Sequence, residues 1–165
     1  MKRIVCVFIL LILLCPSAVA TQWNIPEGAE GIWFIPNLHV QVPVYSSTWS
    51  EWQQIVDAKD SALLNTWLSA RMIADHFNSK DGDGRWNMRQ LKPGDGAYFI
   101  TPTGTNYYKC YMVALVDVGS WGFTINNKVL QPMSSLDIGN RCCVGSDLTK
   151  NYLAVFRYVK TLKQY

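Results

Sequence analysis

Charge is scarce in this sequence. Lys, Arg, Asp and Glu make up 16% of the 165 residues, against about 25% in an average globular domain. Disordered chains are rich in charge and poor in aromatic residues, whereas aromatic residues reach 13% here. Proteins that bind nucleic acid carry a basic stripe and a high pI, and this chain has a formal net charge of only +3. We therefore expect a folded protein that does not bind nucleic acid.

Repeats, low-complexity tracts and linkers are also missing, and the length suits a single domain. The sequence contains no Cys-x-x-Cys pair. Structural zinc sites combine four ligands at regular spacing, so we expect neither a metal nor another cofactor.

The N-terminus has the three parts of a secretory signal peptide. Basic residues at 2–3 precede an apolar run from Ile4 to Leu14, and small residues at 18 and 20 suit a cleavage site before Thr21. A membrane span needs about 20 apolar residues, which this run does not reach. We expect residues 1–20 to be removed and residues 21–165 to form the exported domain; a retained membrane anchor is the alternative.

Cleavage changes the cysteine count. Cys6 and Cys15 leave with the signal peptide, so Cys110, Cys142 and Cys143 remain. A domain of this size buries about 68% of its unfolded surface and needs no disulfide framework. An odd number of cysteines in an exported chain leaves at least one thiol without an internal partner, and that thiol calls for an explanation.

Short strands dominate the pattern of the mature chain. Alternation predicts a half-buried strand over Leu38–Tyr45, where Pro43 indicates an edge or a bulge. Two early helices are predicted, over Thr48–Ala58 and Ser61–Trp67. Further strands are predicted at Ala70–Ala74, Gly96–Thr101, Tyr107–Val118, Trp121–Ile125, Val129–Gln131 and Asn151–Lys160, with a helical turn at Arg85–Leu91. This pattern predicts a mainly β barrel or rolled sheet.

The order of several motifs resembles that of the sortase family. The motifs resemble its opening strand, the strand that ends at its catalytic histidine, its Leu-x-x-Gly-Asp turn, the partner strand of the following hairpin, and its last strand. They are, in the same order, Ile35–Tyr45, Met72–His76, Leu91–Asp95, Tyr107–Val113 and Asn151–Val159. The resemblance implies a sortase-like closed β-barrel of about seven to eight strands with one or two short helices.

The same resemblance implies a secreted cysteine transpeptidase or peptidase. Such an enzyme cuts a peptide or protein substrate at a sorting-type motif, holds the acyl part as a thioester and passes it to an amine acceptor at the cell wall. It implies a bacterial protein of Gram-positive type that acts at the extracellular surface. We expect it to work as a monomer.

The resemblance assigns the catalytic roles to particular residues. His76 is the expected general acid and base, whereas His39 is expected to be an ordinary exposed histidine. The nucleophile is Cys143, with Cys142 as second choice, although the window from Ile138 departs from the family's Leu-x-x-Thr-Cys motif. Adjacent strand residues face opposite ways, so Cys143 as nucleophile leaves the small Cys142 at the Thr position, whereas Cys142 as nucleophile leaves Arg141 there.

Other arrangements of the thiols remain open. One cysteine of the pair can bond to Cys110 while the other is inert. A Cys110–Cys142 disulfide leaves Cys143 free for catalysis, and a bond between the two neighbouring cysteines blocks it. Papain-like hydrolases place the cysteine before the histidine, the reverse of the order here, so we set that class aside.

The third catalytic position departs from the family. Asn151 stands where a sortase has its Arg, and an Asn can donate a hydrogen bond but brings no charge. Arg157 shares the predicted face of Asn151 but lies ~20 Å away along the strand. Arg71, Arg89 and Arg141 are the other candidates for a positive group. The departure keeps an alternative function open, that of a non-catalytic sortase-fold binding protein of the cell surface.

Overall fold

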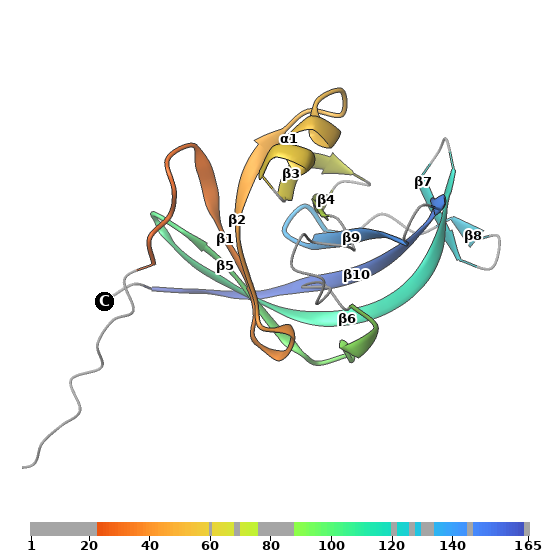
Figure 1. Cartoon of the computed structure of the whole chain (residues 1–165). Coiled ribbons are helices and arrows are strands. Elements are labelled where there is room, and N and C mark those ends of the chain that lie inside the picture. Colours follow the sequence, from red (N-terminus) through yellow and green to blue (C-terminus); the bar gives the residue numbers. More distant parts are fainter. Residues whose placement is uncertain are drawn as a thin grey trace, which may run out of the picture.

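A computed structural model describes residues 23–59, 61–67, 70–75, 88–119, 122–125, 128–129, 134–144 and 147–163. Strands make up most of this part of the chain (Figure 1). The strands are β1 (Ala29–Ile35), β2 (Val40–Ser47), β3 (Ser61–Trp67), β4 (Ala70–Asp75), β5 (Gly96–Thr101), β6 (Gly104–Gly119), β7 (Gly122–Ile125), β8 (Lys128–Val129), β9 (Ile138–Val144) and β10 (Asp147–Leu162). The helices are α1 (Trp52–Lys59) and the short 3-10 turns η1 (Pro36–Leu38) and η2 (Met88–Gln90).

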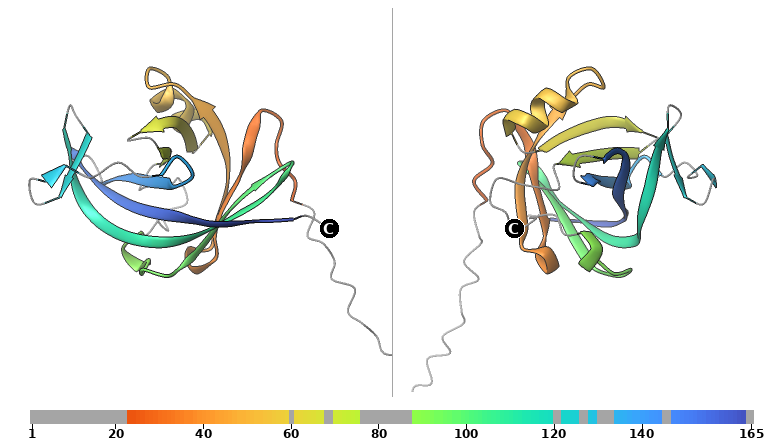
Figure 2. Two further views of the ribbon diagram at one scale, coloured as in Figure 1. Left: turned by 180° about the vertical axis from the view of Figure 1, so that it is seen from behind. Right: turned by 45° about the vertical axis from the view of Figure 1, so that its right-hand side comes forward.

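The strands close into a barrel. Hydrogen-bonded neighbours follow the order β10-β9-β4-β3-β2-β1-β5-β6, and β6 pairs back onto β10. The β7–β8 hairpin extends β6 outside this closed ring, and α1 lies over β3 on the outer surface (Figure 2). The predicted closed β-barrel of seven to eight strands is confirmed.

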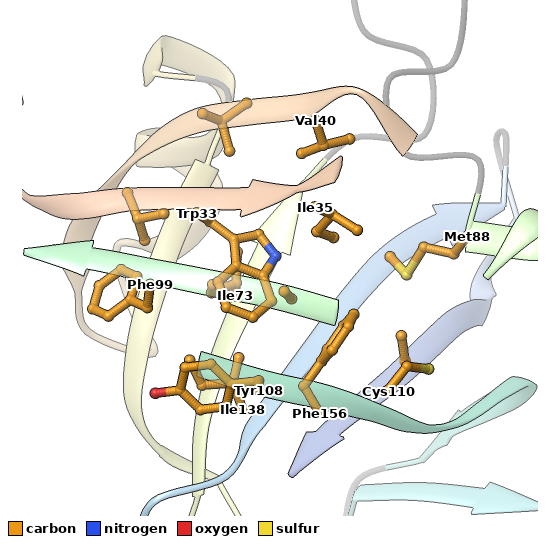
Figure 3. Close-up of a cluster of buried hydrophobic side chains, with 14 of the residues drawn as sticks. Trp33, Ile35, Val40, Ile73, Met88, Phe99, Tyr108, Cys110, Ile138 and Phe156 are labelled. Carbon is orange, nitrogen blue, oxygen red and sulfur yellow. The ribbon is translucent and has the colours of Figure 1, made fainter. Parts of the chain in front are cut away.

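Aromatic rings fill the barrel (Figure 3). Trp33 is fully buried, and its ring centroid lies 6.5, 5.7 and 5.2 Å from those of Phe99, Tyr108 and Phe156. The indole Nε1–H of Trp33 donates to Oδ1 of Asn140 at 2.8 Å. One side chain from β1 therefore contacts β5, β6, β9 and β10 across the core.

The predicted first helix is present but begins later. The hydroxyl of Thr48 donates to the carboxylate of Glu51 at 2.7 Å, in the turn before α1. Trp49 lies in the predicted helix, but in the structure it precedes α1 and is 50% exposed. The apolar face of α1 consists of Trp52, Ile55 and Val56, which pack with Ala62 and Ala74. In the described ranges no helix is long and apolar enough to span a membrane.

The predicted second helix is wrong, because Ser61–Trp67 forms β3. This strand pairs in parallel with β2 and antiparallel with β4, which closes the ring on that side. Hydrogen bonds to two neighbours and the burial of Ala62 and Leu63 outweigh the modest helix preference of Ala and Leu.

Pro43 lies inside β2 at a point where only one side of the strand is paired. It lies opposite Ile32 of β1, whereas pairing with β3 begins at Tyr45. The missing N–H of the proline therefore leaves no ladder hydrogen bond unmade. Its carbonyl accepts a hydrogen bond from Oγ of Ser61.

The remaining predicted elements agree with the structure to within a few residues. β5 has the predicted bounds, and β4, β6, β7, β8, β10 and η2 overlap their predicted segments. The strand β1 was not predicted as a separate element. Gly31 interrupts its apolar pattern, and a Cβ there would collide with the carbonyl oxygen of Ile100 on the neighbouring strand β5.

Replacing Trp33 with Phe tests the central hydrogen bond. The variant loses part of the ring and leaves Oδ1 of Asn140 buried without its donor. We expect the free energy of unfolding to fall by about 2–4 kcal/mol in urea denaturation. The matched control Trp49→Phe alters a half-exposed ring, and its stability should stay within about 0.5 kcal/mol of the wild type. Equal losses at the two positions would contradict this account of the core.

Candidate active site

Three neighbouring strands carry the predicted site positions. β4 lies beside β9, and β9 lies beside β10. In the parallel β4–β9 pair, Asp75 at the end of β4 lies opposite Cys142. In the antiparallel β9–β10 pair, Cys143 lies opposite Asn151. His76 follows Asp75 in the sequence and lies outside the described residues.

The two faces of β10 have different neighbours. Tyr152 and Ala154 pack in or against the barrel core. Asn151 and Leu153 alternate with them and are fully buried on the other face. The register sets Cys142 opposite Tyr152. The side chain of Asn151 thus points away from the barrel core. It lies on the same face of the sheet as position 143 of β9.

Asn151 is a buried amide without a hydrogen-bond partner. Its exposed fraction is 0%, and among the described residues neither its Oδ1 nor its Nδ2 has a partner. The buried side chains beside it on this face are apolar, namely Leu153 on the same strand and Val116 opposite it on β6. Burying a polar group unpaired costs about 1–3 kcal/mol, so the fold carries this residue at a cost.

A second asparagine shows the ordinary arrangement. Asn140 of β9 is also fully buried, but its Oδ1 accepts from Trp33 and its Nδ2 donates to the carbonyl oxygen of Ile73 at 3.3 Å. The buried side chains of Ser61 and Asp137 are hydrogen bonded as well. Asn151 differs from these residues in its pairing rather than in its burial.

Two of the candidate arginines lie beside the cysteine segment, on opposite faces of the sheet. The guanidinium carbon of Arg89, in η2, lies 4.8 Å from the ring centroid of Tyr152, which packs against the barrel core. That of Arg141, in β9, lies 4.6 Å from the ring centroid of Trp52 in α1. Sequence patterns gave no signal for either ring contact, because each joins segments far apart in the chain.

The other basic candidates lie away from the site. Arg71 begins β4 opposite Ile138 and donates to the hydroxyl of Tyr108 at 2.7 Å. Arg157 is exposed, with its guanidinium carbon 3.7 Å from the ring centroid of Tyr111. Lys150, which precedes Asn151 on β10, is exposed. None of these three side chains lies beside Asn151 on its buried face.

Cys110 is a free, buried thiol on β6. Its Sγ donates to the carbonyl oxygen of Met112 at 3.7 Å. Burial, and secondly the negative charge of Asp95, raise the pKa of the Cys110 thiol to about 11. The structure thus contains no disulfide from Cys110 to Cys142 or Cys143. Because thiolates are the reactive form, Cys110 is unsuited to act as a nucleophile at neutral pH.

His39 is exposed, as expected, but it lies outside the strand predicted for it. It occupies the turn between η1 and β2 with a φ of 53°, and its backbone N–H donates to the carbonyl oxygen of Pro36. In the part of the chain that the structure describes, no three His, Cys, Asp or Glu residues are grouped so that they could hold a metal ion.

Comparisons with known proteins bear on the fold. No protein-family model and no curated protein sequence gives a significant match to this chain. Solved structures do match. Sortase A of Listeria monocytogenes superposes with a TM-score of 0.61 at 16% identity, over 84% of this chain and 92% of that one.

Two further matches were solved with peptides. Sortase E1 of Streptomyces coelicolor, with a tripeptide in its active site, gives a TM-score of 0.62 at 17% identity, over 86% of this chain and 94% of that one. Clostridium perfringens sortase C, with the C-terminal cell wall sorting motif, gives 0.58 at 17% identity, over 83% and 74%. The chain therefore has the sortase fold.

The raised pKa of Cys110 predicts slow alkylation. In a Cys142→Ala/Cys143→Ala protein without its leader, Cys110 is the remaining thiol. At pH 8 the native protein should react with iodoacetamide about 100-fold more slowly than the urea-unfolded protein, because a smaller fraction is thiolate. Comparable rates in the two states would show that the thiol is neither buried nor shifted.

The same shift predicts a pH dependence of stability. The folded protein holds the Cys110 proton above pH 9, where an unfolded thiol loses it, so the stabilisation is complete below about pH 9 and is lost as the pH rises toward about 11. The urea midpoint should therefore fall more steeply over this range in the wild type than in Cys110→Ala. Parallel curves would contradict the shift.

Proposed function

We propose that this chain is a secreted, sortase-like cysteine transpeptidase or peptidase that acts on a sorting-type peptide through a thioacyl-enzyme. The observation that carries the proposal is the strand register within a sortase fold. Asp75, which precedes His76, lies opposite Cys142, and Asn151 lies opposite Cys143. The segments that the resemblance assigns to the site are far apart in the sequence, and they meet on three adjacent strands.

The register also favours Cys143 as the nucleophile. Asn151 faces away from the barrel core, and the residue opposite it on β9 is Cys143. Cys142 is opposite Tyr152, which packs against the core. Directly opposed residues of an antiparallel pair interact on one face of the sheet, so a nucleophile that uses the Asn151 amide is best supplied from position 143.

The proposed reaction has two half-steps. His76 takes the proton of the Cys143 thiol, and the thiolate attacks the carbonyl carbon of the scissile peptide bond. The C–N bond breaks, the imidazolium returns its proton to the leaving amine, and the acyl group remains as a thioester. An incoming amine then loses a proton to His76 and attacks the thioester, and Cys143 leaves as the thiolate; water in place of the amine gives hydrolysis.

The substrate class and the setting follow from the same proposal. Two sortases of similar fold were solved with a tripeptide and with a cell wall sorting motif, which supports a peptide substrate here. The acceptor is an amine at the bacterial cell wall, and the protein is a monomer at the extracellular surface. Substrate specificity resides in two segments, Asn78–Gly84 and Ser120–Asp137. The first lies outside the described residues, and the second is described only in part.

Trapping the acyl-enzyme tests the nucleophile. The wild-type domain is incubated with a peptide library, and mass spectrometry locates the added acyl mass, which we expect on Cys143. Cys143→Ala should lower turnover at least ~10⁴-fold, because the covalent step is lost. Cys142→Ala is the matched control and should keep turnover within about tenfold. The reverse result would assign the role to Cys142, and no acylation of the wild type would overturn catalysis.

Export predicts a defined N-terminus. If residues 1–20 are a signal peptide, the protein recovered outside a bacterial host begins at Thr21, as intact mass and N-terminal sequencing would show. Replacing Ala18 and Ala20 with Leu should block cleavage, since the site needs small residues. Wild-type protein that retains residues 1–20 on the membrane would indicate an anchor instead.

One observation favours a second candidate, a non-catalytic sortase-fold binding protein of the cell surface. Asn151 brings no positive charge to the position that matches the family's Arg. This candidate predicts that peptides bind without acylation and that Cys143→Ala binds them as the wild type does.

A further inference from the structure

We propose that Asn151 is a peptide-binding residue whose side-chain amide forms paired hydrogen bonds with the backbone N–H and C=O of one extended residue of the bound substrate. Its Nδ2 donates to the substrate carbonyl, and its Oδ1 accepts from the substrate N–H. This inference rests on the proposed function and specifies how the site recognises its substrate without a charge at position 151.

The first argument is the contrast between two buried asparagines. Asn140 and Asn151 both have an exposed fraction of 0% and lie on adjacent strands. Both amide atoms of Asn140 are hydrogen bonded inside the fold, whereas within the described ranges both amide atoms of Asn151 are unpaired. A buried polar group that the fold itself leaves unpaired is a candidate for pairing with a ligand.

The second argument is the chemistry of the free group. A carboxamide offers one acceptor atom and one donor group side by side. A carboxylate or a phosphate accepts only and leaves Oδ1 unpaired, and a cation leaves Nδ2 unpaired. The N–H and C=O of one residue in an extended peptide point to the same side, so one substrate residue satisfies both atoms of Asn151.

The third argument is position. Opposed residues in an antiparallel pair have Cα atoms about 4.5–5.5 Å apart, and Asn151 is opposed to Cys143. Successive Cα atoms of an extended peptide are 3.8 Å apart. A substrate residue held by Asn151 is thus at the scissile bond or one residue from it.

The experiment uses matched substitutions at the two asparagines. Asn151→Leu removes both unpaired amide atoms from an apolar face, so the melting temperature of the ligand-free domain should rise by about 2–8 °C. Asn140→Leu breaks two hydrogen bonds and should lower it. Alanine at each position is a second matched pair whose smaller side chain cannot clash, and Asn151→Ala should cost far less than Asn140→Ala.

The activity arm uses the peptide that acylates the wild type fastest in the library. Asn151→Leu should slow acylation by about 10²–10³-fold, the usual loss for a hydrogen-bond donor at a reacting carbonyl. Asn151→Asp keeps an acceptor but loses the donor and adds negative charge, and should lose as much. Loss of thermal stability at Asn151 equal to that at Asn140 would overturn the inference, because it would reveal partners inside the fold.

The outcomes separate the inference from the proposed function. Acylation at the wild-type rate in Asn151→Leu, together with its loss in Cys143→Ala, would overturn the role of Asn151 and leave the cysteine enzyme intact. Unchanged acylation in Cys143→Ala would instead count against the proposed nucleophile. The thermal comparison of the two asparagines does not depend on any activity.

Discussion

The hydrogen bond from Trp33 to Asn140 fixes the strand that carries the two cysteines. It joins β1 to β9 across the barrel interior, and the second amide atom of Asn140 is bonded to Ile73 on β4. A slip of β9 by one residue would move Asn140 out of the core and put Gly139 or Arg141 in its place, because side chains alternate along a strand. The buried amide therefore sets the register that places Cys142 opposite Asp75 and Cys143 opposite Asn151.

Local sequence patterns predict strands well where alternation and turn residues agree. They fail where hydrogen bonding to neighbouring strands determines the secondary structure. The β5 strand at Gly96–Thr101 ends at a clear turn and was predicted with its bounds. The segment Ser61–Trp67 has a helical composition, but parallel and antiparallel neighbours make it a strand. Gly31 weakens the pattern of β1 for a reason that only the fold reveals, namely the close approach of the Ile100 carbonyl. Such contacts depend on residues about 70 positions away, which no local window contains.

The candidate site was likewise predictable from the sequence only in part. The order of the motifs was enough to single out the strand before His76, the cysteine pair and Asn151. It said nothing of whether Asn151 is paired, because that depends on the side chains that β6 and β10 bring around it. Nor did it indicate the state of Cys110, whose burial and free thiol follow from its place in the barrel core. The sequence thus proposed positions, and the fold supplied the environments of Asn151 and Cys110.

The two faces of the sheet carry different positive charges beside the cysteine segment. Arg141 is opposed to Leu153, on the face of Asn151, and its guanidinium rests on Trp52. Arg89 rests on Tyr152, on the face of the barrel core. Two residues along a strand span ~6.6 Å, so Arg141 lies one residue pair along the face of Asn151 and brings a positive charge to it. In the proposed site the neutral amide of Asn151 is therefore accompanied by the positive charge of Arg141 from the next residue pair.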